Sequence, residues 1–397
     1  MLAKSKSSCS KNIILYPGHI YVILYVLYFF TMDNSEPTKS LLFIPDISGF
    51  TEFIETTEVE HSQHVIAELL EILIESNTYQ LQLAEVEGDA LFFYKENEIF
   101  SLEKLLAQVE TMFTSFYSHL KLLETNRICP CKACSSAPNL GLKIIIHSGE
   151  LQFISVQENR KPFGKQVIEA HRLMKNSVNS DNYVLLSKDV ANDIGLLESY
   201  QSKRYAFEKG ANEYDGKNID YLYAVIDPEK LMLSPFSQAK KYVFNTPSKI
   251  INEQKFAISA SELLEYITNY KYRHLWVDGV DQFEYNENET TRIGTEHICV
   301  INDKHLNFKT VTKEANAGQL VYGELTSNIP VADELFQFYI LTPLTNNSCK
   351  LKTEVYWKAK SPIKRLIMWA FVSNVFRKNG KKALTKLNAF IESLKIN

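Results

Sequence analysis

The sequence lacks three features that would each mark a class of protein. Its 43 lysines and arginines do not outnumber its 47 acidic residues, and a net charge of -4 gives no support for a nucleic-acid partner. Six cysteines in 397 residues do not resemble a secreted disulfide framework, which favours a reducing, cytoplasmic compartment. No internal repeat or low-complexity tract is present. The remaining composition is that of a globular chain too long for one core, so two domains are expected.

Charged residues are also missing near the N-terminus. Residues 12–32 contain no Lys, Arg, Asp or Glu, and residues 20–30 are all apolar or aromatic, which is nearly enough to cross a bilayer of ~30 Å. Lysines precede this stretch and Asp33 follows it, so the positive-inside rule would export everything after it. For the extension 1–39 two interpretations stay open: a membrane anchor, or a segment upstream of a start at Met32. The order of the charges favours the second.

The most informative stretch is residues 44–51, Ile-Pro-Asp-Ile-Ser-Gly-Phe-Thr. An apolar strand ends here and Phe50 begins a helical spacing, so Asp46 lies at the carboxyl end of the strand, where ligands of open sheets collect. Backbone N–H groups at the helix start can bind an anion, and Asp46 can bind a hard cation. We predict a metal and phosphate site; a turn or helix cap is the plain alternative.

Residues 40–226 interleave helix and strand patterns, which predicts an α+β domain with one sheet. Helices are expected over residues 65–74, 102–123 and 166–175. One strand pair turns at residues 87–89 with Asp89 at its tip, and a second, 140–147 with 150–156, is expected to turn at Ser148-Gly149. A linker follows over residues 227–242.

Four motifs then occur together in order: Asp46-Ile-Ser-Gly-Phe-Thr, Glu85-x-x-Gly-Asp89, Gly141-x5-His-Ser-Gly149 and Phe163-Gly-x-x-Val-x-x-Ala-x-Arg172-Leu. In order and approximate spacing they resemble the class III adenylate/guanylate cyclase catalytic domain. The resemblance implies a ferredoxin-like βαββαβ core, a head-to-tail homodimer, and ATP or GTP as substrate.

The resemblance also implies roles for single residues. Asp46, Asp89 and the backbone of Ile47 would bind two Mg²⁺ or Mn²⁺ ions, which is two-metal chemistry. Arg172 matches the arginine that stabilises the transition state, and its planar guanidinium suits phosphate oxygens. Phe50, from the first motif, and Lys217, on a hairpin that carries a lysine in the family, are expected at the substrate.

Three positions bear on the base and the ribose. Glu85 matches the glutamate of guanylate-type members, and a carboxylate can accept from guanine. The second base-contacting position is Lys161, so these two side chains are expected to face each other with the charges of the adenylate type reversed; two separate solvated charges are the alternative. Ile168 replaces the ribose-binding Asn. Removing one such contact typically costs about 10²–10³ in rate, so a slow or inactive cyclase is expected.

A cysteine cluster, Cys129-Pro-Cys131-x-x-Cys134, follows the long helix. Three thiols at this spacing can bind Zn²⁺ if a fourth ligand is present, and His119, His147 or a partner's residue are the nearby candidates. Reduced free cysteines are the alternative interpretation. His61 and a second histidine three residues later are interpreted as exposed.

Residues 243–397 predict a different architecture: a strand, a helix with a Ser cap over residues 261–268, a series of long strands and a closing helix over 362–394. This order resembles the START-like, polyketide-cyclase-type (SRPBCC) helix-grip superfamily, which implies a cavity for an apolar small molecule. The aromatic residues available to line it are Trp276, Phe308, Tyr322, Phe336, Phe338, Tyr339, Tyr356, Trp357 and Trp369. Core filling is the alternative.

Two functions therefore stay open. In the first, the chain is a purine nucleotide cyclase of altered efficiency, coupled to a ligand-binding domain. In the second, the cyclase-like domain is an inactive nucleotide-binding or dimerisation module attached to the same ligand binder.

Overall fold

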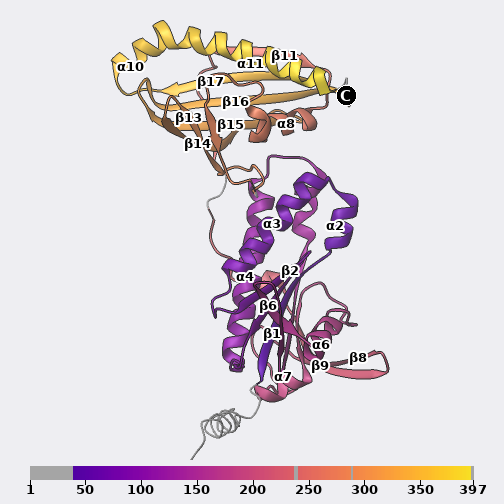
Figure 1. Cartoon of the computed structure of the whole chain (residues 1–397). Helices are drawn as coiled ribbons and strands as arrows, with labels where there is room; N and C mark the ends of the chain where they lie inside the picture. The colour runs from indigo at the N-terminus through magenta and orange to yellow at the C-terminus, as the bar shows by residue number, and fades with distance from the viewer. Residues whose placement is uncertain (1–38, 237–239, 288, 395–397) are drawn as a thin grey trace, which may run out of the picture.

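The computed structural model describes residues 39–236, 240–287 and 289–394, which form two bodies stacked end to end (Figure 1). We call the part from β1 to β9 the N-terminal body and the part from β10 to α11 the C-terminal body. The apolar stretch 12–32 and the start at Met32 lie outside the described residues, so both interpretations of that extension stay predictions. Among the helices in the described ranges, none has the length and apolar character needed to cross a membrane.

The N-terminal body is built on a sheet with the strand order β2-β3-β1-β4-β7-β9-β8. Its strands are β1 (Ser40–Ser48), β2 (Gln82–Glu87), β3 (Ala90–Lys95), β4 (Gly141–Gly149), β7 (Tyr183–Ser187), β8 (Glu208–Tyr214) and β9 (Lys217–Val225). Neighbouring strands are antiparallel, apart from the parallel pair β4 and β7. The order β2-β3-β1-β4, with helical connections after β1 and β3, is the predicted βαββαβ arrangement.

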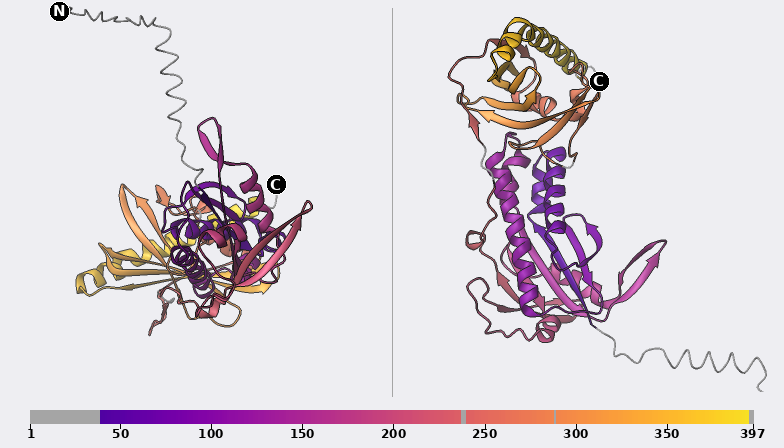
Figure 2. Two further views of the ribbon diagram at one scale, coloured as in Figure 1. Left: turned by 90° about the horizontal axis from the view of Figure 1, so that it is seen from below. Right: turned by 90° about the vertical axis from the view of Figure 1, so that its left-hand side faces the viewer.

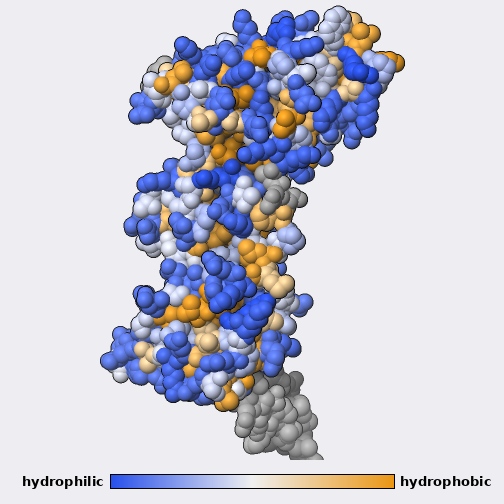
Figure 3. Space-filling model, turned by 180° about the vertical axis from the view of Figure 1, so that it is seen from behind, coloured by the Kyte–Doolittle hydropathy of each residue, from blue (hydrophilic) through white to orange (hydrophobic). Residues whose placement is uncertain are grey.

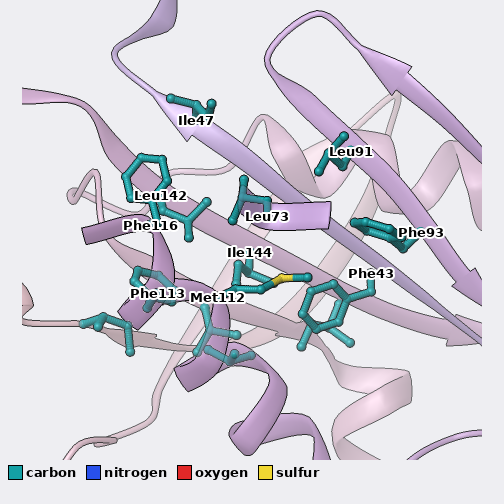
Figure 4. Packing of buried hydrophobic residues seen from close by; sticks show 14 of the residues in the cluster. Phe43, Ile47, Leu73, Leu91, Phe93, Met112, Phe113, Phe116, Leu142 and Ile144 are labelled. Atoms are coloured by element: carbon teal, nitrogen blue, oxygen red, sulfur yellow. The ribbon is translucent and has the colours of Figure 1, made fainter. Parts of the chain in front are cut away.

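Two long helices, α3 and α4, cover one face of this sheet and run toward the C-terminal body (Figure 2). The helices after β1 and β3 are α2 (Phe50–Thr56), α3 (Val59–Glu75), α4 (Leu102–Asn126) and α5 (Lys132–Ser136), followed by a 3-10 turn (Ala137–Asn139). Phe43 and Ile144 of the sheet pack with Phe113 of α4 in the largest buried cluster (Figure 4). Burying such side chains stabilises the fold by about 1.5–3 kcal/mol each. Because side chains alternate along β1, Leu42 and Asp46 point to the opposite face.

The opposite face of the sheet carries α6 (Lys165–Met174), and α7 (Lys188–Asp193) follows β7. Here one prediction is wrong: β5 (Gln152–Val156) pairs with β6 (Asn159–Phe163) in a separate hairpin and not with β4. Gly149 is not a hairpin turn but the last residue of β4. A Cβ at Gly149 would lie 2.5 Å from Gln166, so the glycine permits the close approach of α6.

The C-terminal body contains one antiparallel sheet with the strand order β11-β17-β16-β15-β14-β13-β12, and β10 pairs with β14 at its side. Its strands are β10 (Lys241–Tyr242), β11 (Ile250–Phe256), β12 (Gln282–Glu284), β13 (Glu296–Ile301), β14 (Lys304–Lys313), β15 (Leu320–Ile329), β16 (Ala332–Thr345) and β17 (Ser348–Lys358). Before β10, the connection makes a 3-10 turn (Pro228–Lys230), and Ser234 N–H donates to Ser118 Oγ of α4 at 2.8 Å. The connection therefore runs back along α4.

Helices stand before and after the strands of this second sheet at the places along the chain where the sequence predicts them, and the predicted closing helix 362–394 is divided by a π-helical turn. They are α8 (Ala260–Thr268), α9 (Tyr270–Arg273), α10 (Pro362–Ile367), a π-helical turn (Met368–Val372) and α11 (Ser373–Leu394). α8 begins one residue before the predicted helix, and the serine that caps it is Ser259, whose hydroxyl accepts from Glu262 N–H. Leu384, Leu387 and Ile391 of α11 are buried in the core with α8. The face of the molecule seen in Figure 3 is mainly hydrophilic, with apolar areas on both bodies.

Candidate functional site

Asp46 lies inside β1, on the sheet face that carries α6. Its neighbours across the strands are Ala90 of β3 and Lys143 of β4. Only 5% of Asp46 is exposed, and its carboxylate oxygen lies 3.2 Å from Lys143 Nζ. β1 extends to Ser48, so it continues for two residues beyond Asp46, which the sequence predicted at the carboxyl end of the strand. The acid therefore sits in the sheet and not in a loop, which makes the plain turn interpretation wrong.

Asp89 is held beside Asp46 by the hairpin of β2 and β3. Ile47 N–H donates to the carbonyl of Asp89 at 3.1 Å, which ties the tip of this hairpin to β1. Gly88 has a φ of 69°, in the left-handed region that favours glycine, so the tight turn depends on it. The predicted metal set, Asp46, Asp89 and the Ile47 backbone, thus comes together at one place.

Electrostatics at this place are those of two acids forced together. Burial raises the pKa of Asp46 to about 6; the charge of Lys143 opposes this rise and the charge of Asp89 adds to it. Burial also raises the pKa of Asp89. Two neighbouring carboxylates with raised pKa values repel each other unless a proton or a cation lies between them. Carboxylate oxygens are ligands that Mg²⁺ and Mn²⁺ prefer, so the residues fit such ions.

The predicted base-contacting pair is brought together as well. Lys161 Nζ of β6 donates to Glu85 Oε2 of β2 at 2.8 Å. The two side chains are 43% and 47% exposed, so the ion pair is solvated. They lie on two hairpins of the same chain, and no partner is needed for them to meet.

The remaining predicted substrate residues are engaged inside the chain. Arg172 of α6 forms an ion pair with Asp215 at the tip of the β8–β9 hairpin, and Lys217 of that hairpin pairs with Glu169. Ile168, one turn before Arg172, is 54% exposed. Phe50 begins α2 and packs partly buried against the main core, and its expected place at the substrate stays a prediction.

A second group of ligand atoms lies at the junction of the two bodies. His61, Cys129, Cys131 and Cys134 each offer one ligand atom, and these atoms all lie within 4.8 Å of one another. Hydrogen bonds from the other two thiols lower the pKa of Cys131. The prediction that His61 is an exposed histidine is wrong, since its side chain is 16% exposed.

The histidines proposed as fourth ligands are bound elsewhere. His119 Nε2 lies 2.8 Å from Glu68 Oε2. His147 is buried, with Nδ1 2.7 Å from Ser187 Oγ and Nε2 2.8 Å from Gln166 Oε1. Burial lowers the pKa of His147. Both ring nitrogens of His147 are thus occupied, and neither histidine completes the cysteine cluster.

Comparisons with known proteins give the following matches. A family model described as "Protein of unknown function (DUF2652)" matches residues 66–183. "Uncharacterized protein Rv2561/Rv2562" of Mycobacterium tuberculosis is 31% identical over 126 residues, which are 32% of this chain. The chain spans 58% of the length of that relative.

Solved structures that resemble about half of the chain are catalytic domains of adenylyl and guanylyl cyclases. The adenylyl cyclase CyaB from P. aeruginosa is 16% identical, with a TM-score of 0.35 over 49% of this chain and 97% of its own. The catalytic core of a rhodopsin-guanylyl cyclase in complex with ATPalphaS is 15% identical, with a TM-score of 0.35 over 48% of this chain and 96% of its own.

Sequence reasoning missed three residues of these sites. Lys143 is the one cation on β4 that faces Asp46. The sequence pattern that could have identified it is a single charged residue within the otherwise apolar run 142–146. His61 and Glu265 join the cysteine cluster from other parts of the chain, with His61 Nε2 2.6 Å from Glu265 Oε2. No local pattern identifies these two, because only tertiary packing brings them to the cysteines.

Proposed function

We propose that the N-terminal body is a nucleotidyl cyclase-like module that binds a purine nucleoside triphosphate with two divalent cations between two copies of the chain. The observation that carries the proposal is the pair Asp46 and Asp89, two adjacent acids whose pKa values are raised by burial and which lie on the sheet face away from α3 and α4. Such a pair is stabilised by cations of the kind that accompany a triphosphate.

The proposal assigns each residue a task. Asp46, Asp89 and the carbonyl of Ile47 hold the cations, and Lys143 is the cation that balances Asp46 before they bind. When bound, two divalent ions neutralise the triphosphate and activate the ribose 3′-hydroxyl. Glu85 accepts from a guanine base if Lys161 releases it, so GTP is the better fit to the glutamate and ATP is the other candidate.

A second copy of the chain is proposed to complete the site. Exposed apolar side chains surround the region that would receive it: Ile154 on β5, Phe163 at the end of β6 and Ile168 on α6, which are 40%, 56% and 54% exposed. Apolar side chains at this exposure favour burial against a partner. Arg172 would serve the site of the other copy once it leaves Asp215.

A second candidate is a module that binds nucleotide without turnover. Ile168 is the observation that favours it, because an aliphatic side chain at this position offers no hydrogen bond to a ribose. The Glu85–Lys161 ion pair also occupies both groups that would recognise the base.

One experiment separates the two candidates. The purified full chain is incubated with ATP or GTP and Mn²⁺, cyclic nucleotide is measured, and Asp46→Ala is assayed in parallel. Product above the level of the variant supports the cyclase. No product above that level, together with a nucleotide-induced rise in Tm that Asp46→Ala abolishes, supports the binding module. No product and no thermal shift would contradict both.

For the C-terminal body we propose an apolar ligand with a polar end group, as in a START-like binder. The support is a buried polar centre among the predicted aromatic residues: Arg273 is 3% exposed, forms an ion pair with Glu324, and donates to the hydroxyls of Tyr322 and Tyr339. Its Nε has no hydrogen-bond partner in the described residues. Organic extraction of the purified chain followed by mass spectrometry tests this; the absence of any co-purified small molecule would contradict it.

A further inference from the structure

We propose that His61, Cys129, Cys131 and Cys134 bind one Zn²⁺ ion, and that Glu265 of the C-terminal body orients His61, so that the ion fixes the two bodies to each other. This inference does not depend on the nucleotide site. It rests on four ligand atoms, on the hydrogen bonds around them and on one contact that crosses the junction.

The ligand atoms already approach a tetrahedron. With Zn–S bonds of about 2.3 Å and Zn–N bonds of about 2.0–2.1 Å, a nitrogen and a sulfur ligand lie about 3.6 Å apart and two sulfurs about 3.8 Å apart. His61 Nδ1 lies 3.1 Å from Cys131 Sγ and 3.6 Å from Cys134 Sγ. All four atoms lie within 4.8 Å of one another, so side-chain shifts of less than about 1 Å would complete the site.

The loop that carries the cysteines is shaped to hold thiolates. Cys131 N–H points to Cys129 Sγ at 3.4 Å, and Cys134 N–H points to Cys131 Sγ at 3.3 Å. Hydrogen bonds to sulfur favour its charged form, which is the form that binds metal. The Glu58 carboxylate, at the start of α3, accepts from the N–H groups of residues 132 and 133 and so holds the loop beside His61.

Glu265 fixes the ring of His61. Its Oε2 lies 2.6 Å from His61 Nε2, while Nδ1 faces the thiols. A carboxylate that accepts the second N–H of a metal-binding histidine sets the tautomer, and its loss typically weakens metal binding by 10- to 100-fold. Because Glu265 lies on α8, this contact joins the C-terminal body to the ligand set.

The junction contains a second polar anchor close by. Glu68 of α3 is 5% exposed and accepts from Thr290 N–H at 2.6 Å, from Arg292 at 2.8 Å and from His119 at 2.8 Å. Ile293 N–H donates to the carbonyl of Asn126 at 2.9 Å. The cysteine cluster and the contacts of Glu68 together hold α3 and the end of α4 against the C-terminal body. Zinc would therefore make an existing junction more rigid.

The types of ligand atom indicate which metal the site binds, and a cleft beside the site gives the ion access to it. Three thiolates and one imidazole are the ligands of structural zinc sites, whereas Mg²⁺ and Ca²⁺ prefer oxygen. Cys129, Cys134 and His61 line a cleft between the bodies, which leaves a route for the ion. All four ligand side chains are half-buried.

The first test measures metal in the full chain purified under reducing conditions. We expect about one zinc per chain by elemental analysis, and near zero in Cys131→Ser. Replacement by Co²⁺ should give the absorption bands of thiolate-bound tetrahedral cobalt. Cys349→Ser is the matched control, because Cys349 is buried in the other body and should leave the metal content unchanged. A chain without zinc that also fails to bind added Zn²⁺ or Co²⁺ would overturn the proposal.

The second test addresses the link between the bodies. Glu265→Ala should weaken zinc binding 10- to 100-fold in a chelator competition, and Glu265→Gln, which keeps an acceptor, should weaken it less. Glu262→Ala is the control, since this exposed glutamate lies one turn away on the same helix. Limited proteolysis of the connection 227–242 should speed up after zinc removal and in Glu265→Ala. Equal affinity and equal proteolysis in Glu265→Ala and Glu262→Ala would contradict the role of Glu265.

Discussion

The acid pair and the cysteine cluster differ in how much of each site one chain supplies. At the acid pair, Asp46 and Asp89 repel each other, and the residues that would meet a substrate are occupied by ion pairs within the chain. At the cysteine cluster, four ligands and an orienting carboxylate are all present in one chain. The acid pair destabilises the metal-free chain, and bound cations would remove this cost. The cysteine cluster stabilises the fold when the zinc ion binds. Replacing a metal-binding side chain should therefore raise the stability of the metal-free chain at the acid pair and lower the stability of the zinc-bound chain at the cysteine cluster.

The largest effect is expected at the cysteine cluster. Cys131→Ser should lose zinc and about 3 kcal/mol or more of stability, since metal-binding energy is folding energy. At an unfolding entropy of about 2.1 cal/mol/K per residue, that corresponds to a fall in Tm of about 4 °C for the 397-residue chain in differential scanning calorimetry. Unchanged Tm in a variant shown to be zinc-free would mean that the ion does not support the fold.

The next effect concerns Ile168 at the acid-pair site. Ile168→Asn restores a side chain that can bind a ribose, and the position is 54% exposed, so the fold should tolerate it. We expect the rate of cyclic nucleotide formation to rise about 100-fold relative to Ile168→Ala, which adds no hydrogen bond. Equal rates in the two variants would show that the missing Asn does not limit turnover.

Neutralising Asp46 should stabilise the metal-free chain. Its pKa rises from 3.8 to about 6 on folding. Above pH 6 the ionised carboxylate is therefore less favourable in the native state than in the unfolded state, and this difference lowers the free energy of unfolding. Asp46→Asn should gain about 3 kcal/mol at pH 7.5 in urea unfolding. This gain should shrink as the pH falls from 6 toward 3.8, because Asp46 then takes up a proton in the native state.

Glu68→Gln is the matched control for this prediction. Glu68 is as buried as Asp46, but its hydrogen bond to His119 and the charge of Arg292 overcome the effect of burial and lower its pKa. Neutralising Glu68 should therefore destabilise the chain at pH 7.5. A loss of stability in both variants would contradict the raised pKa of Asp46.

The smallest effect is expected at the Glu85–Lys161 ion pair. Both side chains are nearly half exposed, and exposed pairs typically contribute about 0.2–1 kcal/mol. A double-mutant cycle with Glu85→Ala and Lys161→Ala should give a coupling energy in that range. A coupling above about 2 kcal/mol would indicate a desolvated pair and a closed base pocket.

Local sequence determined much of the N-terminal body. The first strand, the hairpin tip at Asp89 and the long helices follow from hydrophobic periodicity and turn residues, and the structure confirms them, although the strand continues through Asp46 to Ser48. The turn proposed at Ser148-Gly149 failed because the glycine serves the packing of α6. Instead, β5 and β6 turn through Gln157, a non-glycine residue with a φ of 56°, which composition does not reveal.

The fourth ligand could not be predicted for a similar reason. His61 lies in the first turn of α3, whereas the cysteines follow α4, and only the packing of α3 against α4 and α5 brings them together. Glu265 comes from the other body. The START-like assignment and the boundaries at residues 226 and 243 stay predictions, although the strands and the closing helix follow one another along the chain as predicted.

Native mass spectrometry of the full chain tests the comparison most directly, because one spectrum counts zinc, divalent ions, nucleotide and subunits. We predict one zinc on every chain before any addition. With GTP or ATP and Mn²⁺ we expect a dimer that carries nucleotide and Mn²⁺, and the Asp46→Ala variant should not form this dimer although it keeps its zinc. Chains without zinc, or nucleotide bound equally by the Asp46→Ala variant, would contradict it.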